Sequence, residues 1–135
     1  MTVVNDTYTG HVDAGTAARR TLPAATIVKA SVGPMDNNAY LITCSATGKT
    51  LLIDAANDGP ALVELIRSQA PDVELIVTSH QHFDHWQALA EVVLAVVEDD
   101  DVGVIGVDDD ALMRTPRSTV ASGAFVISVT GSSSR

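Results

Sequence analysis

Three short apolar segments follow one another closely along the chain, and this arrangement constrains the fold more than any other feature of the sequence. Residues 27–32, 39–44 and 50–54 each have the length and composition of a β-strand. The links between them, residues 33–37 and 47–49, contain turn-forming residue types such as Gly, Pro and Asn. Because links this short join antiparallel neighbours, we expect the three strands to lie side by side in one sheet.

Two amphipathic segments follow these strands, with a further short strand between them. Asp58 is a candidate N-cap for a first helix, and Pro71 ends that helix. Residues 73–77 have the composition of a strand, and a second helix is expected to start near Asp84. The order β-β-β-α-β-α predicts an α/β fold in which helices and sheet pack in layers, an α+β layered arrangement.

The two ends of the chain differ in composition from its middle. Residues 1–25 are small and polar without sustained periodicity, so we expect an irregular N-terminal arm before a domain over residues 26–97. Residues 98–135 form an acidic, Ser-rich tail that we expect to be irregular. Within this tail, residues 102–107 and 124–129 have a composition that is compatible with strands.

The tail also lacks several residue types altogether. From Leu94 to the end the sequence contains no His, Lys, Asn, Gln, Tyr, Trp or Cys. This abrupt change suggests a truncated or frame-shifted gene end. The hypothesis is tested by reading the coding DNA beyond codon 94 in the other two frames, and it is wrong if neither encodes a further histidine-bearing α/β segment.

Charge and cysteine content bound the partners and the setting of the chain. Its formal net charge is −9, which argues against nucleic acid and anionic membranes because both are bound through Lys and Arg. Eight of the 17 acidic residues fall within residues 91–110, so much of the imbalance belongs to one segment. Cys44 is the only cysteine, and no signal segment or membrane-length apolar run is present, so we expect a cytoplasmic protein.

A cluster of metal-binding residue types follows the fourth predicted strand. Three of the four histidines, His80, His82 and His85, lie within six residues and next to Asp84. In an extended chain residues i and i+2 point to the same side, so His80 and His82 can chelate one ion together. Asp84 and His85 come where the chain turns into the helix, and they could hold a second ion. A lone histidine is usually a surface or core residue, but this combination favours a site for Zn²⁺ or a similar metal.

The motif and the strands before it resemble a known family. Residues 78–85, Thr-Ser-His-Gln-His-Phe-Asp-His, resemble the His-x-His-x-Asp-His signature of the metallo-β-lactamase superfamily, which includes glyoxalase II-like thioester hydrolases. Residues 38–42 and 51–55 resemble the early strands of the family, including Asp54 at the end of one of them. The resemblance spans about residues 27–93, and it implies the first half of the family's αββα sandwich.

This resemblance also implies roles for individual residues. His80 and His82 would ligate a first ion, and Asp84 and His85 would ligate a second, with Zn²⁺ expected and other divalent metals as alternatives. Asp54 would support the ligand loop from behind, as carboxylates commonly do for metal ligands, or would simply be a turn residue at the end of a strand. The family's nucleophile is a metal-bound hydroxide, and Asp84 would also take a catalytic role by orienting the attacking water.

Two functions follow as alternatives. The first is a metal-dependent hydrolase of a small-molecule ester, thioester or lactam. The second is a non-catalytic, truncated remnant that binds metal weakly or needs a partner, because the family completes its metal sites downstream and no histidine follows His85. The only other histidine is His11, and the acidic runs at residues 98–101 and 108–110 are expected to be solvated rather than to bind metal. Half of a sandwich would leave apolar sheet surface uncovered, so a homo-oligomer is a further expectation.

Overall fold

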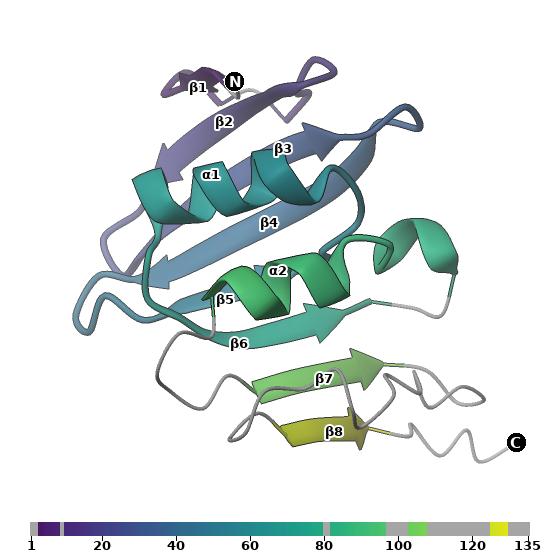
Figure 1. The fold of residues 1–135 in the computed structure, drawn as a ribbon. Coiled ribbons are helices and arrows are strands. Elements are labelled where there is room, and N and C mark those ends of the chain that lie inside the picture. The colour runs from purple at the N-terminus through teal and green to yellow at the C-terminus, as the bar shows by residue number, and fades with distance from the viewer. Residues whose placement is uncertain (1–2, 9, 80–81, 97–102, 108–124, 130–135) are drawn as a thin grey trace, which may run out of the picture.

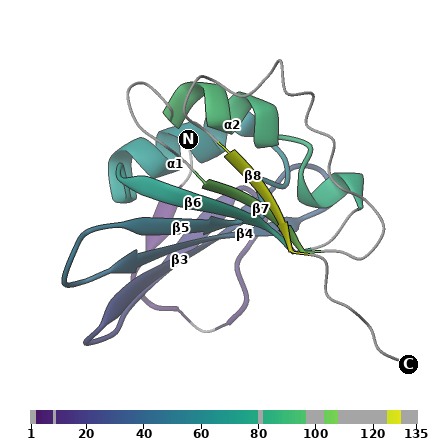
Figure 2. The ribbon, with the colours of Figure 1, turned by 90° about the horizontal axis from the view of Figure 1, so that it is seen from below.

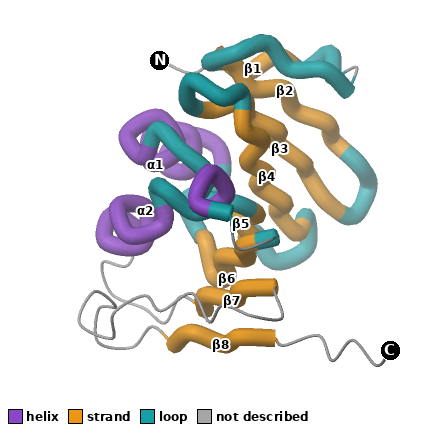
Figure 3. Tube along the Cα trace, turned by 90° about the vertical axis from the view of Figure 1, so that its right-hand side faces the viewer, coloured by secondary structure: helices purple, strands orange, loops and turns teal. Residues whose placement is uncertain are grey.

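The structure is a computed structural model that describes residues 3–8, 10–79, 82–96, 103–107 and 125–129. In it one sheet carries two helices on one of its faces, so that helices and strands form two layers (Figures 1, 2 and 3). The strands are β1 (Val3–Asn5), β2 (Thr16–Thr21), β3 (Ala25–Val32), β4 (Asn37–Cys44), β5 (Thr50–Ile53), β6 (Val73–Thr78), β7 (Gly103–Val107) and β8 (Phe125–Val129). The helices are α1 (Gly59–Gln69) and α2 (Leu89–Val96), and Phe83–His85 form a 3₁₀ turn.

The strands lie in the sheet in the order of the sequence, β1 to β8. β2, β3, β4 and β5 pair antiparallel, whereas β5, β6, β7 and β8 pair parallel, and β1 is parallel to β2. The predicted antiparallel sheet of three strands is therefore confirmed. The predicted order of three strands, a helix, a strand and a helix is confirmed as well, which gives the layered α/β fold that the sequence indicated.

The N-terminal part of the sheet corrects one expectation. Residues 1–25 were expected to be irregular, but β1 and β2 fall among them, and β2 pairs with β3 from Ala17↔Ala30 to Thr21↔Thr26. The expectation was wrong here because β2 has almost no apolar signal: its buried residues are only Ala17 and Ala18. Backbone pairing with a neighbouring strand, rather than a pattern of large apolar side chains, holds β2 in the sheet.

The first helix begins and ends where its sequence indicated. The Asp58 side chain accepts a hydrogen bond from the backbone N–H of Ala61 at 3.3 Å, which confirms it as the N-cap of α1. The helix ends at Gln69, before Pro71. Its buried face presents Leu62 and Ile66 to the sheet.

The second helix begins later than predicted. It was expected to start near Asp84, but Phe83–His85 form a 3₁₀ turn and α2 starts only at Leu89. The reason is a contact outside the segment: the backbone N–H of Ala88 donates to the carbonyl of Ala55 at 3.0 Å. That N–H is therefore not available to a helix that runs on from Asp84, and the bond links the 3₁₀ turn to the loop after β5.

The two faces of the sheet differ in how far they are covered. On the face beneath the helices, Leu41, Leu52 and Ile76 are fully buried. Alternate residues of the same strands, such as Ile42 and Leu51, point to the other face and stay partly exposed. This matches the expectation that one face of the sheet would be left incompletely covered.

Part of the tail is regular. β7 and β8 lie within residues 98–135, and they confirm the two segments of that tail whose composition was compatible with strands. The rest of that tail lies outside the described residues, and its frame-shift origin and the proposed division into domains stay predictions. Among the described helices, neither has the length and apolar character needed to cross a bilayer.

Candidate metal centre

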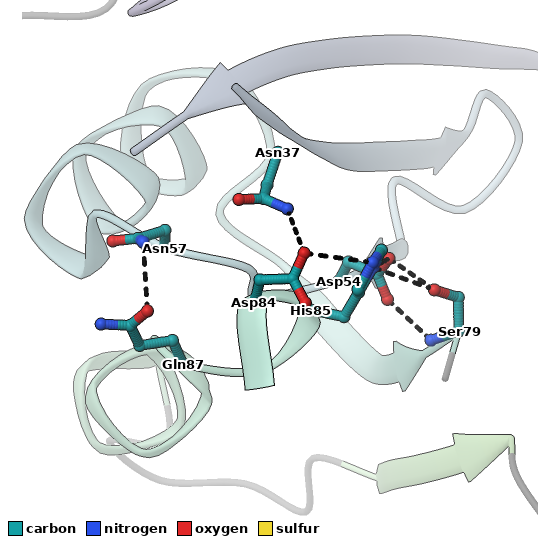
Figure 4. Close-up of polar contacts among 7 residues, drawn as sticks. All are labelled: Asn37, Asp54, Asn57, Ser79, Asp84, His85 and Gln87. Atoms are coloured by element: carbon teal, nitrogen blue, oxygen red, sulfur yellow. Dashed lines mark hydrogen bonds and ion pairs between the residues drawn. The ribbon is translucent and has the colours of Figure 1, made fainter. Parts of the chain in front are cut away.

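The motif lies at the edge of the sheet where parallel strands end. β5 and β6 are parallel neighbours, so Asp54, directly after β5, and Ser79, directly after β6, come to the same edge. The 3₁₀ turn with Asp84 and His85 lies over this edge (Figure 4). Asn37, the first residue of β4, reaches it from the antiparallel side.

Asp54 uses both of its carboxylate oxygens within the protein. Oδ1 accepts the backbone N–H of Ser79 at 2.7 Å, and Oδ2 accepts the Ser79 hydroxyl at 2.6 Å. The same Oδ2 lies 2.8 Å from Nδ1 of His85. Asp54 is only 6% exposed and has a left-handed backbone with φ 61°, a conformation that Asp adopts more readily than most residues. It therefore joins the ends of two strands to the 3₁₀ turn.

This contact orients the His85 ring. Because a carboxylate only accepts hydrogen bonds, Nδ1 of His85 carries the proton that faces Asp54. In the neutral ring Nε2 then bears the lone pair, which is the form that binds a metal. Nε2 lies 3.6 Å from Oδ2 of Asp84. A histidine held through its other nitrogen by a carboxylate is a common arrangement behind metal ligands.

Asp84 is held from a different direction. Its Oδ2 accepts a hydrogen bond from Nδ2 of Asn37 at 2.8 Å. This bond lowers the pKa of the Asp84 carboxyl below its usual value, the nearby imidazoles of His85 and His82 act in the same direction, and burial opposes them. Asp84 is therefore an ionised carboxylate at neutral pH, which is the form required of a metal ligand.

The two remaining histidines of the motif are less completely defined. His82 is exposed, has an extended backbone and precedes the 3₁₀ turn. It helps to lower the pKa of Asp84, so its ring lies in the same neighbourhood. His80 lies outside the described residues, so the predicted chelation by His80 and His82 stays a prediction. The structure does bring Asp84 and His85 together, and it places Asp54 behind His85.

The donors present suit a zinc ion. Two ligands of one tetrahedral Zn²⁺, at bonds of roughly 2.0–2.2 Å, lie about 3.4 Å apart. Nε2 of His85 and Oδ2 of Asp84 are separated by 3.6 Å, close to that spacing. Within the part of the chain that the structure describes, no three His, Cys, Asp or Glu side chains converge on one point. The described residues thus supply two donors of a site, and His80 and His82 are the predicted source of others.

Unpaired buried atoms gather at the same edge. The described residues include three buried side-chain atoms without a hydrogen-bond partner: Oγ of Ser31, Oδ1 of Asn37 and Oγ1 of Thr78. The Asn37 and Thr78 atoms lie at the start of β4 and at the end of β6, on the helix side of one edge of the sheet, whereas Ser31 pairs with Asn38 and faces the other side. Such atoms are few in native proteins, and bound water, an ion or a catalytic role usually explains them. The position of the Asn37 and Thr78 atoms supports a functional site here.

Sequence reasoning did not reveal the contribution of Asn37. It lies directly after a turn, at the start of β4, but it is 47 positions away from Asp84 in the sequence. Local spacing cannot indicate a contact of that kind. The bonds of Ser79 to Asp54, which join the ends of two strands, could not be predicted from local spacing either.

Comparisons with known proteins agree with this fold. Residues 32–98 match the model of the metallo-beta-lactamase superfamily. A probable hydroxyacylglutathione hydrolase of Schizosaccharomyces pombe is 35% identical over 57 residues, which are 40% of this chain and 22% of the relative. The cytoplasmic isozyme of hydroxyacylglutathione hydrolase from Saccharomyces cerevisiae is 38% identical over 56 residues, which are 42% of this chain and 20% of the relative.

Solved structures show the same relationship. The B3 metallo-beta-lactamase BLEG-1 superimposes with a TM-score of 0.50 at 26% identity, over 58% of this chain and 35% of that one. The metallo-beta-lactamase FIM-1 from Pseudomonas aeruginosa, in its mono-zinc form, shares the fold with a TM-score of 0.52 at 12% identity, over 86% of this chain and 52% of that one.

Fold and site together define a layered α/β protein with candidate metal-ligand residues at the carboxyl edge of its sheet. Residues 32–98 belong to the metallo-beta-lactamase superfamily, and this stretch includes the whole His-x-His-x-Asp-His segment. It spans about a fifth of the length of the curated relatives that it matches. The predicted family and fold are therefore confirmed for this part of the fold.

Proposed function

We propose that the chain provides the ligand loop of a metal-dependent hydrolase that acts on a small ester, thioester or lactam. The observation that carries this proposal is the convergence of Asp84 and His85, each held by a partner from another element. The matched relatives support it, because they are named as hydroxyacylglutathione hydrolases and as a B3 metallo-beta-lactamase. These proteins are named as hydrolases or as a lactamase, and their names do not indicate one common substrate.

The residues of the motif would each have a role in binding the metal. Asp84 and His85 would hold one divalent ion, and His80 and His82 would hold the same ion or another. Zinc is the expected metal, because the donors are imidazole and carboxylate and FIM-1 is described in a mono-zinc form. Bound zinc lowers the pKa of water to roughly 7 and polarises a carbonyl group, so it supplies a nucleophile and an electrophile at neutral pH.

The protein side chains then fix the geometry in which this chemistry takes place. Asp54 keeps His85 in the tautomer whose Nε2 can bind the metal. Asp84, ionised and held by Asn37, is placed to accept a hydrogen bond from a water molecule and so to orient it. Rigid placement matters, because misplacement by about 1 Å can cost roughly 100-fold in rate.

A second candidate is a non-catalytic metal binder, or a remnant that needs a partner chain. One observation favours it: only two donors converge among the described residues, whereas a catalytic zinc normally has three protein ligands and a water. A site with fewer protein ligands would bind metal weakly. A small molecule remains the proposed substrate under the first candidate, and neither candidate calls for nucleic acid or a membrane as partner.

The setting that we propose is the cytoplasm. The single cysteine, Cys44, cannot form an intramolecular disulfide, which suits a reducing compartment. One of the matched relatives is named as a cytoplasmic isozyme, which supports the same setting.

Zinc binding and turnover in the purified chain distinguish the two candidates. We would measure zinc stoichiometry and assay a generic thioester and a chromogenic β-lactam. We expect zinc to bind at micromolar concentration and turnover to disappear in His82→Ala and His85→Ala. His11→Ala is the matched control, because His11 is exposed and pairs with Asp13 away from the motif.

Each result of this experiment has a defined meaning. Turnover that survives in the control and is lost in the two motif variants supports the hydrolase. Bound zinc without turnover supports the non-catalytic binder. If the wild-type chain holds no zinc at micromolar concentration, the hydrolase is ruled out and only the remnant that binds metal weakly or needs a partner is left.

A further inference from the structure

Asn37 makes a contact with the motif that crosses the sheet. It begins β4, and its Nδ2 donates to Oδ2 of Asp84 at 2.8 Å, from a partly buried position (Figure 4). β4 lies between β3 and β5, and Asn37 pairs with Val32 of β3. The donor, Asn37, therefore belongs to an interior strand of the sheet, whereas the acceptor, Asp84, lies in a short 3₁₀ turn.

The orientation of the Asn37 amide is determined by this contact. Its Oδ1 is buried and has no hydrogen-bond partner in the described part of the chain. Turning the amide over would place that oxygen against the carboxylate of Asp84, where two acceptors would meet. The amide thus leaves its own oxygen unpaired and gives its N–H to Asp84, so packing and hydrogen bonding hold the two groups together.

The surrounding turn is packed firmly enough to keep Asn37 in place. Gly33 is the first residue of the turn between β3 and β4, and a Cβ at Gly33 would lie 2.5 Å from Cγ of Asn57. Asn57 in turn donates to Oε1 of Gln87 at 3.2 Å (Figure 4). The turn before Asn37, the loop after β5 and the segment after the 3₁₀ turn are therefore in mutual contact.

The chemistry of an amide suits this position. Nε2 of His85 and Oδ2 of Asp84 are 3.6 Å apart, close to the spacing of two ligands of one ion. Both atoms are acceptors, so they do not attract each other, and a donor from elsewhere is needed to hold the carboxylate at this spacing. The N–H of Asn37 fixes the rotation of the carboxylate, and it leaves the negative charge of Asp84 available, as a lysine or arginine in its place would not.

We propose that Asn37 is a positioning residue for the metal centre, which holds Asp84 open toward His85 so that both can bind one ion. This inference rests on the proposed function, because it gives Asn37 a role only if Asp84 and His85 bind metal. Asn37 itself does not need to touch the metal or the substrate. Outer partners of metal ligands typically change metal affinity by about 10- to 100-fold, and we expect an effect of that size.

A double-mutant cycle measured by zinc affinity tests the proposal. Chelator competition would give the zinc affinity of the wild type, Asn37→Ala, Asp84→Ala and the double variant. We expect Asn37→Ala to weaken zinc binding by about 10- to 100-fold in the wild-type background and by less than about twofold in the Asp84→Ala background. A merely structural role would weaken binding equally in both backgrounds.

Asn38→Ala is the matched control. Asn38 is the next residue of β4, is exposed and lies on the opposite face of the sheet, so its loss should change zinc affinity by less than about twofold. Circular dichroism and urea denaturation would check that each variant folds, and Asn37→Ser replaces Asn37→Ala if the alanine variant does not.

The possible outcomes separate this inference from the function beneath it. Equal zinc affinities in Asn37→Ala and Asn38→Ala, with tight binding by the wild type, overturn the positioning role and leave the metal centre intact. Equal losses in the two backgrounds of the cycle overturn it as well. Absence of zinc from the wild-type chain overturns the metal centre itself.

Discussion

Asp54 shows how a single residue can connect distant parts of the chain. It accepts hydrogen bonds from the backbone and side chain of Ser79, and it faces Nδ1 of His85. Only 6% of its surface is exposed, so it makes almost no contact with water. Its effects on stability and on the ligand loop should therefore be measurable together.

We predict that Asp54→Asn weakens both the fold and the metal centre. The amide keeps the shape of the side chain, but its NH₂ group has to face an N–H or O–H donor, which leaves a buried hydrogen bond unmade. We expect a loss of about 1–3 kcal/mol in the free energy of unfolding, from urea denaturation, and about a 10- to 100-fold loss of zinc affinity. Asp72→Asn is the control, because Asp72 is exposed, and an equal effect there would contradict the role given to Asp54.

The residues of the site differ in how visible they were in the sequence. Asp84 and His85 could be predicted as a pair, because their types and spacing lie within one short segment. Asn37 could not be predicted as their neighbour, because 47 positions separate it from Asp84 and the contact depends on the pairing of whole strands. The role given to His80 rests on the sequence alone, because this residue lies outside the described part of the chain.

Among the elements, those with local signals were the predictable ones. α1 has a capping Asp58 and a terminating Pro71, and β3 and β4 have strand composition with a short turn between them. The start of α2 could not be predicted, because the bond from Ala88 to Ala55 depends on the end of another strand. β2 was missed for a similar reason, since it pairs with β3 and has only Ala17 and Ala18 as buried apolar residues, so it carries little local signal.

Two glycines provide a test of the packing between elements. Gly33 and Gly48 both have a left-handed backbone, with φ of 72° and 75°. A Cβ at Gly33 would lie 2.5 Å from Cγ of Asn57, whereas a Cβ at Gly48 would meet nothing within 4 Å. The two positions therefore share the conformational cost of an alanine and differ in the steric one.

We predict that Gly33→Ala destabilises the fold clearly more than Gly48→Ala. The conformational cost alone should be about 1–2 kcal/mol at each position, and displacement of Asn57 adds to it at Gly33. Urea denaturation of both variants measures the difference. Equal losses of stability would show that the turn before β4 is not packed against the loop after β5.

At the scale of the whole molecule, the sheet face opposite the helices is the face on which apolar side chains are incompletely covered. Ile42 of β4 lies beside Ile27 of β3 and Leu51 of β5, and Leu51 lies beside Leu75 of β6. These four side chains form an apolar row across four strands, and each is partly exposed. Two such rows can stack face to face, as sheets do at a separation of about 10 Å.

We predict that a second copy of the chain covers this face and forms a homodimer. A row that runs straight across the sheet can pack against its own symmetry mate, as two-fold interfaces require. The net charge of −9 opposes association, so added salt should favour the dimer. Sedimentation velocity should show a dimer whose dissociation constant decreases with salt.

Leu51→Lys should abolish this dimer, because it places a charge in the middle of the apolar row. Leu94→Lys is the control: Leu94 is 59% exposed and belongs to α2, on the other side of the molecule. A wild-type chain that stays monomeric at all concentrations and salt levels contradicts the prediction. So does a dimer that Leu94→Lys disrupts and Leu51→Lys does not.

The hydrogen bond between Ala88 and Ala55 affects which sequence changes the ligand loop can accept during evolution. It joins two main-chain groups, so it does not depend on which side chains occupy either position, provided that neither steric crowding nor a proline at position 88 removes it. Point mutations nearby can therefore accumulate without shifting Asp84 and His85. An insertion or deletion between Ala55 and Ala88 would change the length of the connection between them. We therefore expect insertions and deletions in this segment to be tolerated far less often than substitutions.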